Sequence, residues 1–123
     1  MDLAQRAVAC KGWRWLPGML DSDGWRYSGE SEGAHWWWHP EEDQGELPLT
    51  QVRGTPDLTD PATLGCLLAL VREAWGDPHV YAAPDGEDDL WVCHVRISAS
   101  CSGIEAASEA EALVAALEAA SCV

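Results

Sequence analysis

The sequence contains no phenylalanine, and a single lysine, Lys11, stands among its 7 basic residues. Neither of the glycine-rich nucleotide loops, Gly-x-x-x-x-Gly-Lys-Ser/Thr and Gly-x-Gly-x-x-Gly, occurs in it. Ser98, Ser100 and Ser102 do not lie in a Gly-x-Ser-x-Gly setting, and His94, near His79, has no recognisable catalytic partner. These absences argue against ATP hydrolysis, dinucleotide redox chemistry and serine hydrolysis. We predict a protein that is not an enzyme and needs no cofactor.

Two further absences bear on cellular location. The 5 cysteines are odd in number, and no two of them are spaced as Cys-x-x-Cys. No apolar run approaches the roughly 18 residues of a membrane helix, and the N-terminus has no apolar signal core. We therefore expect a cytoplasmic protein that keeps its thiols reduced and does not bind a membrane.

Charge is strongly one-sided, with 7 basic against 21 acidic side chains and a net charge of −14. Residues 1–26 hold four bases against three acids, whereas residues 27–123 hold three bases against eighteen acids. An acidic body repels the phosphate backbone, so direct binding to nucleic acid is not expected. The nearly neutral end suits a small anionic ligand, and the acidic remainder suits a basic protein partner. Solubility alone is the third interpretation of this charge.

The local patterns predict three helices. Residues 2–10 have Asp2 as a candidate cap, and Asp60-Pro61 begins a helix over 61–75 that ends before Gly76. The capping box of Ser108 and Glu111 begins a last helix over 109–120.

Strand patterns occur in two places. The run Trp13–Leu16 alternates and is followed by the turn signal 21–24 and by Trp25-Arg26-Tyr27, which predicts a hairpin. Residues 79–83 and 90–98 predict a second hairpin, with a brief third strand near 103–106. The expected fold is one α+β domain over residues 1–123, a small sandwich in which antiparallel hairpins pack with about three helices in the order α-ββ-α-ββ(β)-α.

Residues 28–57 are the least regular stretch. They contain Trp36-Trp37-Trp38, and three adjacent indoles cannot all face one way in a strand. We expect a long surface loop here, with at most a short extra strand. His35 and His39 flank the tryptophans, and a metal site on one helix face is an alternative to a loop that covers an apolar surface.

The predicted ligand site lies on the first hairpin, because aromatic and basic side chains alternate there. Indole rings stack on nucleobases, and guanidinium groups hold phosphates in a bidentate manner. The candidate binding residues are Lys11, Trp13, Arg14, Trp15, Trp25 and Arg26. The alternative is structural: one strand face supplies tryptophans to the core, and the other supplies solvated arginines.

Three segments resemble a group of small, mostly uncharacterised proteins of tailed phages and prophages. They are residues 12–19 (GWRWLPGM), 57–78 (DLTDPATLGCLLALVREAWGDP) and 108–120 (SEAEALVAALEAA). The C-terminal half is also similar to a small α/β sandwich domain of phage proteins. This group has no established functional site, so the resemblance implies no role for any residue.

The resemblance implies an accessory protein that acts in the host bacterial cytoplasm against host defence. Our leading hypothesis is a sponge, which sequesters a nucleotide immune signal, such as a cyclic dinucleotide or a cyclic ADP-ribose, without cleaving it. The alternative is an acidic inhibitor that binds a host defence protein such as a CRISPR effector, possibly in imitation of DNA. Its candidate residues are Glu41, Glu42, Asp43, Asp85, Asp88 and Asp89. Eight tryptophans are many for one core of this size, so we also expect a homo-oligomer.

Overall fold

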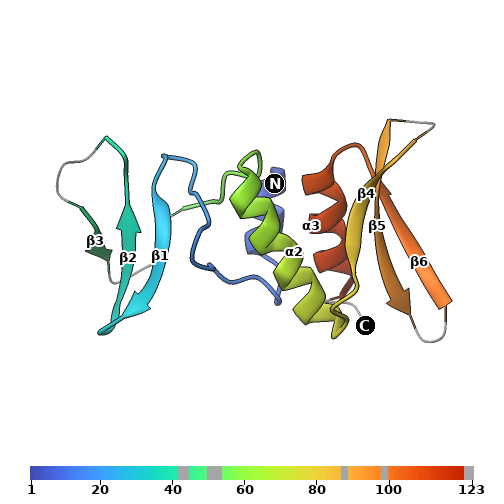
Figure 1. Ribbon diagram of the computed structural model, residues 1–123, viewed down its shortest axis with the longest axis horizontal. Coiled ribbons are helices and arrows are strands. Elements are labelled where there is room, and N and C mark those ends of the chain that lie inside the picture. Colours follow the sequence, from blue (N-terminus) through green and yellow to red (C-terminus); the bar gives the residue numbers. More distant parts are fainter. Residues whose placement is uncertain (42–44, 50–53, 87–88, 98–99, 121–123) are drawn as a thin grey trace. The chain divides into compact units, whose positions relative to one another are not determined.

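The described part of the chain forms three helices and two antiparallel sheets (Figure 1), which confirms the predicted α+β class. The computed structural model describes residues 1–41, 45–49, 54–86, 89–97 and 100–120. The sheets have the strand orders β1-β2-β3 and β4-β5-β6. Along the chain the elements are α1 (Leu3–Val8), β1 (Arg26–Ser31), β2 (Ala34–Trp38), β3 (Leu47–Leu49), α2 (Pro61–Trp75), β4 (Tyr81–Asp85), β5 (Leu90–Ile97), β6 (Ser100–Ala106) and α3 (Glu109–Ala120).

The chain divides into two compact units, and each is described by itself. Residues 1–13 and 67–123 form the first, here called the terminal unit. Residues 14–66 form the second, here called the central unit, which includes the first turns of α2. The expectation of a single domain over residues 1–123 stays a prediction.

In the terminal unit, helix α3 packs on the sheet of β4, β5 and β6 (Figure 1). The core combines alternate residues of β5, Cys93 and Val95, with the apolar stripe of α3 that includes Leu113 and Leu117. The indole Nε1 of Trp75, the last residue of α2, donates a hydrogen bond of 2.9 Å to the Ala116 carbonyl oxygen. This bond satisfies a polar group that would otherwise be costly to bury.

The predicted helix starts and the end of α2 are confirmed, whereas α1 ends at Val8, before the predicted residue 10. Asp2 and Gln5 form a reciprocal capping box at α1, and the Glu111 amide donates to the Ser108 hydroxyl at the start of α3. Gly76 follows α2 with a φ of +62°, the left-handed conformation that suits glycine at a helix C-terminus.

The central unit is built on the meander of β1, β2 and β3. Strands β1 and β2 pair antiparallel, with Tyr27 opposite Trp37 and Arg26 opposite Trp38. Their connection is the two-residue turn Glu32-Gly33, where φ is +55° and +78°. Positive φ at both turn positions matches the twist of a tight hairpin.

Two predictions about this unit are wrong. Residues 13–16 are not a strand: the backbone that pairs with Trp25–Tyr27 is that of residues 18–21, through Gly18 to Tyr27 and Asp21 to Trp25. Residues 28–57 are not one long loop either, because they hold most of β1 and all of β2 and β3.

The three adjacent tryptophans lie in strand β2. Alternation buries Trp37 completely, whereas Trp36 is half-buried and Trp38 is exposed. A strand can therefore hold three adjacent tryptophans, because one indole faces the core and the other two face outward.

Among the described residues, no helix combines the length and the apolar character that a membrane crossing requires.

Candidate functional site

The six residues of the predicted ligand site are divided between the two units. Lys11 and Trp13 belong to the terminal unit, and Arg14, Trp15, Trp25 and Arg26 belong to the central unit. Lys11 and Arg14 are exposed, and the other four are half-buried. The predicted ligand site as a whole therefore stays a prediction.

Trp15 belongs to the aromatic core of the central unit. Its ring packs edge-on against Trp37 at a centroid distance of 5.1 Å and against Tyr27 at 6.3 Å. Tyr27 in turn packs on Trp37 at 4.9 Å and shares a hydrogen bond of 2.8 Å with His35 Nδ1. Edge-to-face rings at these distances stabilise a core beyond simple burial. These contacts agree better with the alternative in which Trp15 is a core residue than with a role in stacking on a ligand.

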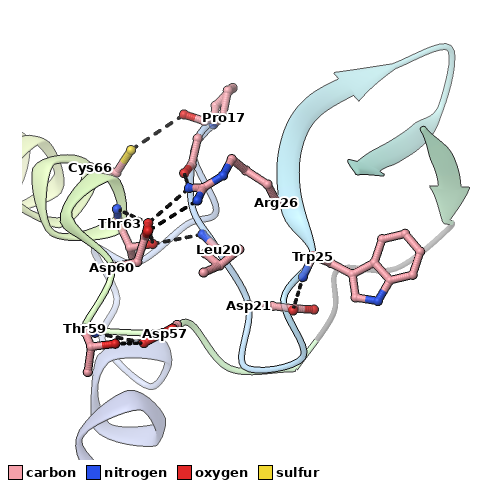
Figure 2. A network of polar contacts seen from close by, with 11 residues as sticks. Pro17, Leu20, Asp21, Trp25, Arg26, Asp57, Thr59, Asp60, Thr63 and Cys66 are labelled. Carbon is pink, nitrogen blue, oxygen red and sulfur yellow. Dashed lines mark hydrogen bonds and ion pairs between the residues drawn. The ribbon is translucent and has the colours of Figure 1, made fainter. Parts of the chain in front are cut away.

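Arg26 is held by the start of α2 (Figure 2). Its guanidinium donates to both carboxylate oxygens of Asp60, at 3.1 and 3.3 Å, and to the Gly18 carbonyl oxygen at 2.7 Å. Asp60 also caps the helix, because its carboxylate accepts from the amide and the hydroxyl of buried Thr63. The hydrogen bonds from Arg26 are the main cause that lowers the pKa of Asp60. The charge of Arg26 is thus matched by a fixed carboxylate.

The turn before β1 is organised by a buried carboxylate. Asp21 is 2% exposed, and its Oδ1 accepts hydrogen bonds from the amides of Asp23 and Trp25 at 2.9 and 2.8 Å. Gly24 follows with a φ of +89°, and a Cβ placed there would come within 3.0 Å of His39 Nε2. Glycine therefore allows the turn to approach the end of β2.

A cavity of about 410 Å³ lies where this turn meets the end of β2. We call it the Trp38 cavity. Its aromatic lining consists of Trp38, which is 43% exposed, and His39. The remaining lining residues are Leu20, Gly24, Arg26, Pro40 and Glu41. Only Arg26 of the predicted site lines it, although Trp25 packs against the His39 ring at a centroid distance of 5.1 Å.

Both ring nitrogens of His39 have partners. Nε2 lies 3.3 Å from the Asp23 carbonyl oxygen, which can only accept, and Nδ1 accepts from the Glu41 amide at 3.1 Å. His35, four residues earlier, bonds Tyr27 instead. Among the described residues, no group of three or more His, Cys, Asp or Glu side chains is arranged to hold a metal ion.

A second hollow, of about 320 Å³, lies along the β1–β2 hairpin. We call it the glutamate groove, because Glu30, Glu32 and Glu46 line it together with the Trp36 indole. All three glutamates are exposed, and none of the described lining residues is basic. Trp36 Nε1 donates to the Ser31 carbonyl oxygen at 3.0 Å, which fixes the ring in the groove wall.

Sequence reasoning missed both hollows, because it assigned β2 to a loop. Of the acidic residues named for the protein-binding alternative, Glu41 lines the Trp38 cavity, whereas Asp85 and Asp89 lie at the β4–β5 turn of the terminal unit. Glu42, Asp43 and Asp88 lie outside the described residues. One usable signal was the dipeptide Glu32-Gly33, because its glycine suits a tight two-residue hairpin turn.

Comparisons with known proteins do not narrow the function. No protein-family model matches the chain, no curated protein is similar to it, and no solved structure matches its fold. The relation to phage proteins stays a hypothesis, and function has to be argued from the two hollows.

Proposed function

We propose that the protein acts in the host bacterial cytoplasm as an acidic inhibitor that binds a basic surface of a host defence protein. The observation that carries this proposal is the glutamate groove, which combines three exposed carboxylates with a fixed indole. A lysine or arginine side chain is attracted by the carboxylates and by the face of the indole ring. Such a groove suits a protein partner better than a phosphate-bearing one.

The distribution of ion pairs supports the same proposal. Arg6 is paired with Glu118 at 2.6 Å, and Arg26 is paired with Asp60 at 3.1 Å. Arg72 directs its Nε to the Val80 carbonyl oxygen. The groove carboxylates have no base among the described lining residues, so the groove attracts positive charge.

Surface carboxylates chiefly accelerate encounter and select the sign of the partner. The interaction would therefore weaken with added salt, because exposed charges are screened within about 8 Å at physiological ionic strength. The salt dependence therefore distinguishes charge-mediated binding from binding through apolar contacts alone.

The test is capture from bacterial lysate at low and high salt, followed by titration of the captured and identified protein. The double variant Glu30→Gln/Glu46→Gln should weaken binding at least tenfold, and Trp36→Ala should weaken it further. The matched control is Glu73→Gln/Glu105→Gln, which removes two exposed carboxylates of the terminal unit. Equal affinities of the groove and control variants would overturn the proposal, as would a partner that binds more tightly at high salt.

The second candidate function is the sponge, which sequesters a nucleotide immune signal without cleaving it. The specific observation in its favour is the Trp38 cavity, whose wall includes Arg26 and whose His39 ring packs against Trp25. Calorimetry with cyclic dinucleotides and cyclic ADP-ribose isomers tests it. Absence of heat with all of them, on folded protein whose oligomeric state has been measured by sedimentation, would refute it.

A further inference from the structure

The Trp38 cavity has the properties of a small-molecule site with a defined preference. At about 410 Å³ it falls within the range of about 300–1,000 Å³ that is typical of ligand pockets, and near its lower end. This volume is enough for one fused ring system with its substituent, and small for a dinucleotide. The strand pairing of Arg26 with Trp38 brings its two walls together.

The walls are flat and rigid. Trp38 presents an exposed indole, and His39 is held in place by hydrogen bonds at both ring nitrogens. Arg26 adds a planar guanidinium that the ion pair with Asp60 immobilises. Flat π surfaces and guanidinium planes favour a planar aromatic ligand, and stacking on one aromatic side chain contributes about 1–3 kcal/mol per base.

Glu41 supplies the polar group that distinguishes one ring from another. Its carboxylate is exposed at the cavity, and the one described base in the lining, Arg26, is already matched by Asp60. A carboxylate accepts two N–H donors side by side. The guanine edge offers an adjacent ring N–H and amino group, whereas the adenine edge places a ring nitrogen acceptor beside its amino group.

We propose that the Trp38 cavity binds a planar heteroaromatic ring with two adjacent N–H donors, of the guanine or pterin type. The ring stacks on Trp38, and its donor edge faces Glu41. Because the protein carries a net charge of −14, phosphate groups on the ligand weaken binding, and the uncharged nucleoside is preferred to its phosphates. This inference uses the same cavity as the second candidate function, the sponge, and rests on it in that respect alone. It adds the identity of the ring that the cavity binds.

The experiment is calorimetry and saturation-transfer NMR with guanosine, guanosine monophosphate, inosine, adenosine and a simple pterin. Guanosine and the pterin should each bind at least tenfold more tightly than adenosine or inosine, because inosine lacks the amino group. Comparison of the guanosine and pterin titrations shows whether a nucleoside or a pterin is the source of the ring. Guanosine monophosphate should bind more weakly than guanosine.

Two variants test the assigned contacts, each against a matched control. Glu41→Gln should lower guanosine affinity at least tenfold, whereas Glu46→Gln, an exposed glutamate of the other hollow, should not. Trp38→Ala should abolish binding, whereas Trp36→Ala should not. Circular dichroism establishes that each variant is folded.

Three outcomes would overturn the proposal: no binding of any ring at millimolar concentration, equal affinity for adenosine and guanosine, or unchanged guanosine affinity in Glu41→Gln. If adenine nucleotides bind and guanosine does not, the ring assignment fails while the sponge function survives. If guanosine binds and no cyclic nucleotide does, the ring assignment stands without the sponge.

Discussion

Replacement of Asp60 should reveal how much of the central unit depends on one carboxylate. Asp60 joins three segments, because it accepts from Arg26 on β1, caps α2 through Thr63, and reaches residue 20 indirectly (Figure 2). The indirect link is the Thr63 hydroxyl, which donates to Asp60 and accepts from the Leu20 amide at 2.9 Å. Asp60→Ala removes the carboxylate oxygens that accept from Arg26 and Thr63, and leaves the Thr63 hydroxyl without its own acceptor.

The expected loss in Asp60→Ala is about 3 kcal/mol of unfolding free energy. The missing helix cap contributes about 1 kcal/mol. A buried Thr63 hydroxyl without an acceptor contributes about another 1 kcal/mol. The ion pair with Arg26 contributes only about 1 kcal/mol, because the arginine side chain is 34% exposed and solvent screens it.

Asp60→Asn is the informative control. The amide oxygen can still accept from Thr63, so the cap persists while the negative charge is lost. We expect a loss of about 1–1.5 kcal/mol, clearly smaller than for alanine. Urea unfolding followed by tryptophan fluorescence measures both values, with the Trp15 and Trp37 cluster as the reporter of the central unit.

The pH dependence follows from the lowered pKa of Asp60. The folded carboxyl releases its proton at lower pH than the unfolded one, whose pKa is about 3.9. The unfolded state therefore binds more protons, and the stabilisation is complete above that pKa and disappears as pH falls through the folded pKa. The stability difference between wild type and Asp60→Asn should shrink between about pH 5 and pH 2.

Two results would refute this reasoning about Asp60. A loss below about 0.5 kcal/mol in Asp60→Ala would mean that the polar network does not stabilise the fold. A difference between wild type and Asp60→Asn that stays constant down to pH 2 would mean that the Arg26 pair does not favour the charged carboxyl.

Three further predictions concern single residues. Glu32→Gly should stabilise the protein by about 0.5–1 kcal/mol in thermal unfolding, because glutamate at a φ of +55° is strained; a lower Tm would contradict this. Trp75→Phe should cost about 1–2 kcal/mol in urea unfolding, since it deletes the hydrogen bond to the Ala116 carbonyl, and an unchanged midpoint would refute it. Iodoacetamide at pH 8 should modify Cys10 well before Cys93, because burial raises the pKa of Cys93 to about 11; peptide mass spectrometry that finds equal labelling would show that assignment to be mistaken.

The helices could be predicted from sequence because their signals are local. Asp60-Pro61 and Gly76 delimit α2 within a few residues of each end, and Ser108 with Glu111 begins α3. Caps depend on side chains three residues away, so no knowledge of tertiary contacts is needed.

The first sheet could not be predicted in the same way, since its partners are chosen by tertiary packing. Trp13 and Trp15 alternate as in a strand, yet β1 pairs with β2 along its length. Trp15 instead inserts its ring edge-on against Trp37. An alternating pair of aromatic residues can thus pack into an aromatic core without pairing its backbone in a sheet.

The Trp38 cavity was beyond sequence reasoning for a related reason. It depends on the register that sets Arg26 opposite Trp38 and on the close approach of Gly24 to His39. A shift of one residue would turn Trp38 inward and Trp37 outward, and no local pattern in the tryptophan run decides between the two. Only burial of the aromatic core fixes the choice.

The location and pairing of the charged residues indicate the kind of partner better than the net charge does. Four of the seven basic residues fall within residues 1–26, and their number alone favours an anionic ligand. Two of these four, Arg6 and Arg26, form ion pairs with carboxylates at 2.6 and 3.1 Å. A paired guanidinium keeps its hydrogen-bonding shape but contributes little net field at a distance, whereas the three glutamates of the groove have no base among their described lining residues. Each ion pair cancels one positive and one negative charge and leaves the net charge unchanged, so the excess of acidic over basic residues still gives the central unit a negative potential. A basic partner therefore fits this protein better than a polyphosphate does.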